Sequence, residues 1–291
     1  MRYEGVVYRP PSEANSLLIQ ATIGCPHNKC NFCAMYKEVK FRLRSVEEIK
    51  EDLAEAARRY GDIVPSIFFP DGNTIIMKTD QLVEIFTYAR ELFPRIQRIT
   101  LYGAARYITK KSAEDMRRLR AAGLSRLHMG MESGDDETLR QLNKGSTAEM
   151  IIDAGRKVKA AGIDLSLYYL VGSGGLARTT EHAKESARVV NAIKPDFLRL
   201  RTLVPVPNTP LWDEYHQGIF QLLSPHQALR EIYTLVENLE AEGTHVLSDH
   251  VSNYWNVDGI IPVDRDEMLN EIKRALTIDE SRFRSPLISQ L

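Results

Sequence analysis

Short apolar runs alternate with longer segments of helical periodicity along most of this chain, and no other feature restricts its fold as strongly. Two of the runs, Ile67–Phe69 and Leu167–Val171, are almost continuously apolar, as strands buried on both faces should be. A strand and a helix that repeat in this way imply a parallel sheet with right-handed crossovers. The predicted strands are Ser16–Ile23, Ser66–Pro70, Arg98–Gly103, Arg126–Met131, Leu165–Val171 and Phe197–Val204. The predicted helices cover about 46–60, 79–93, 112–122, 147–161, 179–193 and 225–242.

The ends of the predicted helices carry residues that favour helix boundaries. Ser45 and Ser146 each stand three residues before a glutamate, which predicts two capping boxes, and Ser224 precedes a proline at the first helical position. A glycine follows four of the helices, where a left-handed residue can end a helix: Gly61, Gly123, Gly162 and Gly243.

Six strand–helix units are too few for a closed eight-stranded barrel, which takes about 250 residues for its eight units. We therefore predict an α/β fold with a partial, six-unit (β/α)6 barrel and a C-terminal extension. The predicted divisions are an N-terminal segment at 1–15, the barrel at 16–211 and a helical cap at 212–291.

Cys25, Cys30 and Cys33 are the only cysteines, and they follow directly after the first predicted strand. An odd, clustered set of thiols is a poor disulfide framework but can share a metal site. The carboxyl ends of parallel strands are also where such folds bind ligands. An iron–sulfur cluster of the [4Fe–4S] type takes four ligands, so three cysteines would leave one iron open to a small molecule. A zinc site with His27 as the fourth ligand is the alternative.

The cysteine loop resembles that of the radical S-adenosylmethionine (SAM) superfamily. The three cysteines close with C-x-x-C, and Phe32 occupies the aromatic position before the last of them. The spacing here is C-x4-C-x2-C, whereas C-x3-C-x2-C is common in the superfamily. The resemblance implies two cofactors, a [4Fe–4S] cluster held by Cys25, Cys30 and Cys33, and SAM, whose methionine part chelates the fourth iron.

The second predicted strand ends in Asp71, Gly72 and Asn73. Members of the superfamily carry a Gly-Gly-Glu-like motif here that receives the ammonium group of SAM, and the resemblance gives these three residues that role. Gly72 would allow close backbone approach. Asp-Gly-Asn also favours a simple turn, which is the alternative.

The fourth predicted strand ends in Gly130-Met131-Glu132-Ser133-Gly134, which resembles the G-x-E-S-G element of one branch of the superfamily. That branch contains the methylthiotransferases, the oxygen-independent coproporphyrinogen dehydrogenases and the Elongator-type enzymes. The resemblance implies that Glu132 and Ser133 bind the ribose or the methionine end of SAM. Glu132 could instead cap the helix that follows.

Two arginines are candidates for the carboxylate of SAM: Arg106, after the third strand, and Arg178, after the glycines at 172–175. Either could equally be a surface charge. The sixth strand runs into a segment similar to the P-x-P-G-T-P-L segment of the same branch, with Asn208 in place of its glycine. In that branch this strand end contacts adenine, which gives the role to Val204.

The C-terminal stretch contains an H-x-S-N-Y run with His250, Asn253 and Tyr254, similar to one in small radical SAM proteins. We expect these residues either to contact substrate at the mouth of the barrel or to satisfy one another within a structured cap. His250 and Tyr254 are also the candidate catalytic residues.

The resemblance implies reductive cleavage of SAM to a 5′-deoxyadenosyl radical, which removes hydrogen from a small-molecule substrate under anaerobic conditions. Flavodoxin or ferredoxin is the expected electron donor. The net charge of −1 argues against a nucleic-acid partner, which usually meets a basic surface. No apolar run approaches the roughly 20 residues of a membrane span, so the expected location is the cytoplasm.

Three other functions stay open from the sequence. The chain could be a non-catalytic protein that delivers haem and binds a cluster. It could be a zinc-binding interaction module, which would be colourless where an iron–sulfur protein is brown. It could also be a radical SAM enzyme that modifies tRNA.

Overall fold

A computed structural model describes residues 1–283 in two compact units. The first unit contains Met1–Asn28, Tyr36–Met129 and Ala154–Leu165, and the second contains Lys29–Met35, Gly130–Asp153 and the chain from Ser166 onward. Within residues 1–283, no helix is both long enough and apolar enough to span a membrane.

The first unit is built on parallel strands in the order β1-β4-β5-β6. These strands are β1 (Leu17–Leu18), β4 (Ser66–Phe69), β5 (Arg98–Tyr102) and β6 (Leu124–Glu132), whose last residues belong to the second unit. A separate antiparallel pair joins β2 (Thr22–Ile23) to β3 (Arg42–Leu43). The helices are α1 (Val46–Tyr60), α2 (Thr79–Leu92), α3 (Ala105–Ile108) and α4 (Ala113–Ala122).

The second unit continues the same strand–helix alternation. Its strands follow the order β7-β8-β9-β10, with β7 (Asp164–Val171), β8 (Phe197–Thr202) and β9 (His245–Leu247) parallel and β10 (Gly259–Ile260) antiparallel. Its helices are α5 (Asp136–Gln141), α7 (Gly175–Ile193), α8 (Pro210–His216), α9 (Pro225–Glu237) and α10 (Arg265–Ala275). Helix α6 (Ala148–Ala160) has residues in both units.

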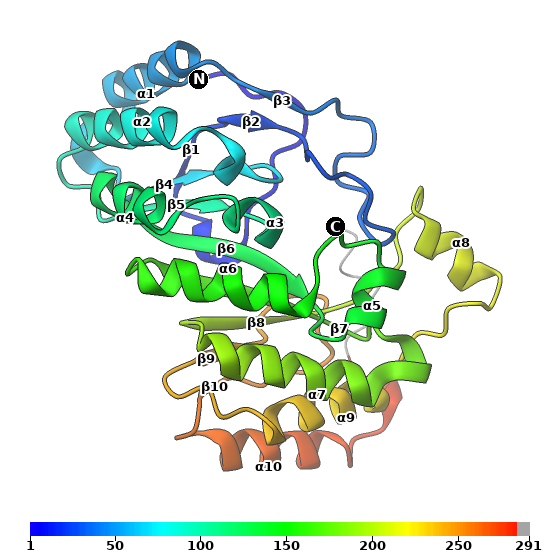
Figure 1. The fold of residues 1–291 in the computed structure, drawn as a ribbon. Coiled ribbons are helices and arrows are strands. Elements are labelled where there is room, and N and C mark those ends of the chain that lie inside the picture. The colour runs from blue at the N-terminus through cyan, green and yellow to red at the C-terminus, as the bar shows by residue number, and fades with distance from the viewer. Residues whose placement is uncertain (284–291) are drawn as a thin grey trace. The chain divides into compact units, whose positions relative to one another are not determined.

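Each unit stacks amphipathic helices side by side, α1 with α2 and α4 in the first and α7 with α9 and α10 in the second (Figure 1). Helix α1 shows why: Ile49, Leu53 and Ala56 recur at helical spacing and are fully buried, while its other face is charged. Its predicted capping box is present, because Ser45 and Glu48 bond each other's backbone amides. The predicted box at Ser224 is present as well.

The predicted α/β class, with a mainly parallel sheet, is confirmed. Two details of the prediction are wrong. The single strand predicted at 16–23 is two, because the chain leaves β4 after Leu18 and pairs as β2 with β3. The helix near residue 147 is capped one residue later than predicted, because the hydroxyl of Thr147, not Ser146, accepts from the amide of Met150.

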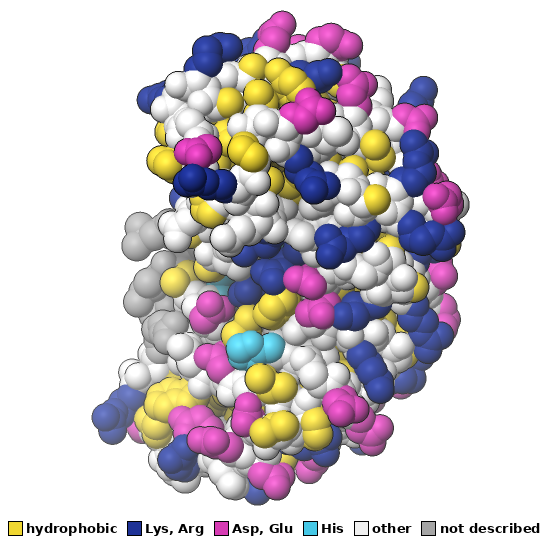
Figure 2. Space-filling view, turned by 90° about the vertical axis from the view of Figure 1, so that its left-hand side faces the viewer, with side chains coloured by type: hydrophobic (Ala, Val, Ile, Leu, Met, Phe, Trp, Pro, Cys, Tyr) yellow, Lys and Arg dark blue, Asp and Glu magenta, His cyan; other side chains and the backbone are white. Residues whose placement is uncertain are grey.

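Exposed charges of both signs are interspersed on the face shown in Figure 2. Lysines and arginines number 38 and acidic residues 39, so no large excess of either sign is available to the surface.

Candidate functional site

Cys25 lies against the loop that follows β4. A Cβ atom added to Gly72 would stand 2.7 Å from the Cβ and 3.0 Å from the Sγ of Cys25. The amide of Gly72 donates to the carbonyl of Gly24, at 3.1 Å. Position 72 therefore tolerates only glycine while the cysteine loop stays where it is.

The carboxylate of Asp71 supports the same cysteine loop from inside the unit. Its Oδ2 accepts from the amide of Gly24 at 3.0 Å and from Nε2 of Gln20 at 3.1 Å. The side chain is almost fully buried, and burial raises the pKa of Asp71 to about 6 although these hydrogen bonds oppose the shift. The next predicted residue, Asn73, accepts from the amide of Ala104 at 2.5 Å.

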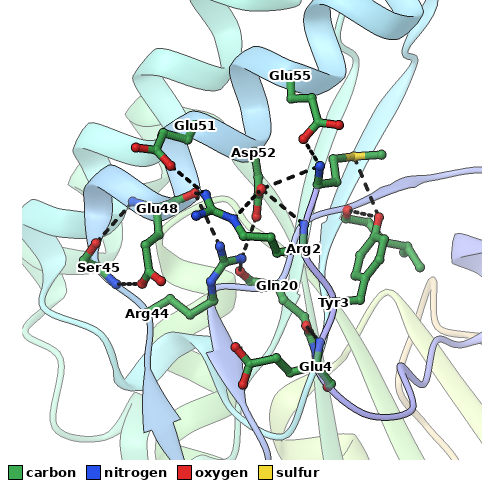
Figure 3. A network of polar contacts seen from close by, with 12 residues as sticks. Arg2, Tyr3, Glu4, Gln20, Arg44, Ser45, Glu48, Glu51, Asp52 and Glu55 are labelled. Carbon is green, nitrogen blue, oxygen red and sulfur yellow. Dashed lines mark hydrogen bonds and ion pairs between the residues drawn. The ribbon is translucent and has the colours of Figure 1, made fainter.

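The N-terminal segment joins this support through the network drawn in Figure 3. Gln20, which binds Asp71, also bonds the backbone of Glu4 through both atoms of its amide group. The backbone carbonyl of Gln20 accepts from the buried guanidinium of Arg44, which forms a 2.7 Å ion pair with Asp52. A chain of polar contacts thus runs from helix α1 to the loop that carries Cys25.

The segment with Cys30, Phe32 and Cys33 belongs to the second unit and is anchored there by backbone contacts. The amide of Asn31 donates to the carbonyl of Leu142 at 2.9 Å, and its carbonyl accepts from the amide of Leu211 at 3.0 Å. These bonds fix the segment between the end of α5 and the start of α8. None of the three cysteines forms a disulfide, and each is partly exposed.

Lys144 is a functional candidate that sequence reasoning missed. Its Nζ lies 2.7 Å from Oε1 of Glu132 and 5.9 Å from the centre of the Phe32 ring. Burial alone would lower the pKa of Lys144, but Glu132 and the neighbouring Cys30 and Cys33 outweigh it and raise the pKa. Lys144 follows Glu132 by twelve residues on another element, so no local pattern marks it.

The G-x-E-S-G element owes its glycines to close packing. A Cβ at Gly130 would overlap the Glu132 carboxylate and approach Nζ of Lys144, and a Cβ at Gly134 would overlap the backbone of α7 at Glu185. Glu132 itself is left-handed, with φ of 65°. The cap of helix α5 is Asp135, which leaves the Glu132 carboxylate to Lys144.

Ser133 is fully buried and its hydroxyl is engaged within the protein. It lies 2.8 Å from Nδ1 of His182 and accepts from the amide of Asp135 at 3.0 Å. His182 stacks on Tyr169, with ring centres 4.5 Å apart, and its Nε2 lies 3.2 Å from the carbonyl of Leu170. Because a carbonyl only accepts, the contact with Leu170 requires a proton on Nε2.

Both arginine candidates have internal partners. Arg178 makes a two-bond pair with Asp135, with Nε and Nη2 at 2.8 and 2.9 Å from the two carboxylate oxygens. Burial opposes ionisation of Asp135, yet the bonds from Arg178 and Thr138 lower its pKa to about 2. Nη1 of Arg106 lies 2.6 Å from Nδ1 of His27, the residue considered for zinc.

A cavity of about 550 Å³ opens where β7 ends, within the range of small-molecule sites. Its walls come from two of the predicted motifs, the glycines at 174–175 and Leu211 of the proline-rich segment, together with Phe220. Phe220 and Phe32, the residue before Cys33, both pack against the apolar cluster that contains Leu211. Val204, placed on adenine by resemblance, lies just beyond the end of β8 and is partly exposed.

The H-x-S-N-Y run lies against β8. Asn253 is buried and fully bonded, with Nδ2 donating to the carbonyls of Leu200 and Ser248 and Oδ1 accepting from Thr202. The polar atoms of Asn253 are thus all used by neighbouring groups of the protein. Tyr254 is half-buried, and burial raises its pKa.

A sequence profile described as the radical SAM superfamily matches residues 19–185. The 4′-phospho-dehydrooxetanocin synthase of Priestia megaterium is 26% identical over 78% of this chain and 32% of that protein. The heme chaperone HemW of Bacillus subtilis is 20% identical over 80% of this chain and 65% of that protein. This chain thus spans about a third of the length of the synthase and about two thirds of that of the chaperone.

The structure of coproporphyrinogen III oxidase (HemN) from Escherichia coli, described as a radical SAM enzyme, superposes on this one with a TM-score of 0.55. The match covers 76% of this chain and 51% of that chain at 19% identity, and it shows a shared fold. It comes from one of the enzyme groups in the branch that the G-x-E-S-G element resembles.

Proposed function

Because this chain belongs to the radical SAM superfamily, we propose that it binds a [4Fe–4S] cluster through Cys25, Cys30 and Cys33 and binds SAM beside it. When bound and reduced, these cofactors supply reductive cleavage of SAM and a 5′-deoxyadenosyl radical that removes hydrogen from the substrate. The observation that most supports this proposal is the ion pair between Lys144 and Glu132 beside Cys30 and Cys33. Such a charged pair adds nothing to the apolar core, which points to a role in binding.

The donor set fits this cofactor pair. Three cysteines within nine residues, none of them in a disulfide, could provide three of the four ligands that such a cluster needs. Lys144 adds a positive charge next to Cys30 and Cys33, and a neighbouring cation favours the thiolate form that binds iron. Gly72 keeps space open beside Cys25.

We assign the carboxylate of SAM to Lys144 rather than to Arg106 or Arg178. Arg178 already makes a two-bond pair with Asp135, and Arg106 contacts His27, whereas Lys144 keeps two of its three N–H donors beside Cys30 and Cys33. Lys144 is also the cation that lies beside two of the cluster ligands.

The remaining predicted residues divide into contacts and supports. Gly72, Glu132 and the strand end at Val204 are proposed to contact SAM, together with the apolar wall at Phe32. A supporting role is proposed for three residues whose polar atoms are bonded internally: Asp71, Asn73 and Ser133. The cavity walled by Leu211 and Phe220 could take the adenosyl part.

The substrate is proposed to be a small molecule, and flavodoxin or ferredoxin the electron donor. A second candidate is a non-catalytic cluster and haem carrier, which the likeness to the heme chaperone HemW supports. A carrier of this kind would bind the cluster and haem and form no deoxyadenosine.

Anaerobic reconstitution with iron and sulfide tests the ligand assignment. The expected result is a brown protein with about four irons and four sulfides per chain, lost in Cys30→Ala and retained in His27→Ala. A colourless protein that takes up zinc and needs His27 would instead support a zinc module.

A further inference from the structure

Strand β8 presents two arginines on one face. Leu198 and Leu200 are buried on the other face, so the alternation of the strand places Arg199 and Arg201 together. In register, Arg199 stands opposite Tyr168 of β7, and Arg201 stands opposite Leu170. Two positive charges on one strand face need acceptors if they are withdrawn from water.

The two arginines differ in their partners. Nε of Arg199 donates to the hydroxyl of Ser166 at 3.2 Å, and its Nη1 lies 3.7 Å from Oδ1 of Asp249. Arg201 is half-buried and has no hydrogen bond or ion pair with any residue in the described range 1–283. The N–H donors of its guanidinium are therefore available to bind a ligand.

His250 is fixed beside Arg201 by the bonds that attach its segment to β8. The amide of Thr202 donates to the hydroxyl of Ser252 at 3.2 Å, and the hydroxyl of Thr202 donates to Asn253 at 3.0 Å. These contacts attach Ser252 and Asn253, which closely follow His250, to the residue next to Arg201. The positive charge of Arg201 is also near enough to lower the pKa of His250.

The tautomer of His250 follows from its backbone contact. Nδ1 accepts from the amide of Ser252 at 3.1 Å, so in the neutral ring the proton is on Nε2. Burial first, and then Arg201, lower the pKa of His250 to about 4, against a weaker opposite effect of Asp249. The neutral ring thus presents an N–H donor next to the unpaired guanidinium. Neither Nε2 nor Arg201 meets an acceptor within residues 1–283.

We propose that Arg201 and the Nε2–H of His250 bind an oxyanion of the substrate, a carboxylate or a phosphate. A guanidinium matches such groups with two parallel N–H bonds, and the neutral imidazole adds a third. The proposal rests on the proposed function, because it names the class of substrate: a small molecule that carries an anionic group. Arg199 is not part of the proposed site, because Ser166 and Asp249 already partner it.

The test uses cluster-loaded protein with 15N-labelled histidine, without SAM or reductant. Inorganic phosphate or acetate is titrated while long-range 1H–15N spectra follow the ring nitrogens of His250. We expect one or both anions to shift Nε2 saturably, and Arg201→Gln to weaken binding about tenfold or more, which is a loss of about 1.4 kcal/mol or more. Tighter binding of phosphate points to a phosphorylated substrate, and tighter binding of acetate to a carboxylate.

Arg230→Gln is the matched control, since Arg230 is exposed on α9. Arg201→Lys covers the case in which Arg201→Gln does not fold: it keeps the charge but not the fork, and weaker binding is expected. The proposal is overturned if neither anion shifts His250, or if either Arg201 variant binds as tightly as the wild type. If the protein binds the anion but forms no deoxyadenosine, only the proposed function is refuted. If it forms deoxyadenosine but does not bind the anion, only the proposed anion site is refuted.

Discussion

The Nζ atom of Lys144 lies 2.7 Å from Oε1 of Glu132, and the pair stands next to Cys30, Cys33 and Phe32. Gly130 makes this possible, since any side chain there would overlap both partners. A charge pair at this position can bind the carboxylate of a cofactor or can only hold the loop in place. The two roles predict different outcomes for loss of the lysine.

Replacement of Lys144 by Met should leave the cluster in place and raise the Kd for SAM about tenfold. A bond from a charged donor contributes about 1.5–3 kcal/mol, and its loss would leave the cofactor carboxylate without that partner. Calorimetric titration of reconstituted protein with SAM measures the change. Lys184→Met, at an exposed position on α7, is the control. Unchanged SAM affinity would remove Lys144 from the cofactor site.

Gly72→Ala should impair cluster loading. The added methyl group would press on Cβ and Sγ of Cys25, and overpacking of this kind costs about 1–3 kcal/mol. Iron and sulfide contents should fall severalfold after reconstitution. Gly218→Ala separates this effect from general strain, because Gly218 has positive φ but nothing within 4 Å of an added Cβ. Full loading of Gly72→Ala would contradict the close approach.

Arg178→Gln should lower the free energy of unfolding by about 1 kcal/mol, since the pair with Asp135 is partly exposed. Asp135 has its pKa lowered to about 2, so its contribution is present above about pH 4 and fades as the pH falls toward 2. Urea unfolding at pH 7 and at pH 3 measures both effects. A severalfold loss of SAM affinity at unchanged stability would instead assign Arg178 to the cofactor.

The folded state should lose stability on acidification through His250. Its pKa of about 4 lies below the ordinary 6.5, so its contribution is complete above about pH 6.5 and declines as the pH falls toward 4. Between pH 7 and 5, we expect His250→Gln to flatten the decline by about 1 kcal/mol, allowing for partial exposure. Urea unfolding across this range provides the test, with His216→Gln at an exposed position as control. Equal slopes for wild type and His250→Gln would show that His250 does not titrate in this way.

The strands and most helices were predictable because buried parallel strands and amphipathic helices leave local patterns. The division of the first strand was not, since it depends on distant partners: β1 pairs with β4 as far as Leu18, and Thr22 and Ile23 pair with β3 instead. The short helices α3, α5 and α8 were missed because four to seven residues are too few to show a period, and α10 was not assigned separately within the predicted helical cap.

The cysteines and the motifs at the strand ends could be found in the sequence, but not the bonds between them. Lys144 meets Glu132, and His182 meets Ser133, across gaps of 12 and 49 residues. Such pairs form only when the chain folds, so no fixed spacing in the sequence predicts them. Their roles toward cofactors, like those of the cysteines, remain predictions to be tested by chemistry.

The most direct test of the account is anaerobic formation of 5′-deoxyadenosine from SAM. Wild-type protein, reconstituted and reduced with dithionite, should form it, and Cys30→Ala, prepared in the same way, should form none. Failure of a brown, fully loaded wild-type protein to form deoxyadenosine, with or without candidate anionic substrates, would contradict the proposed radical chemistry.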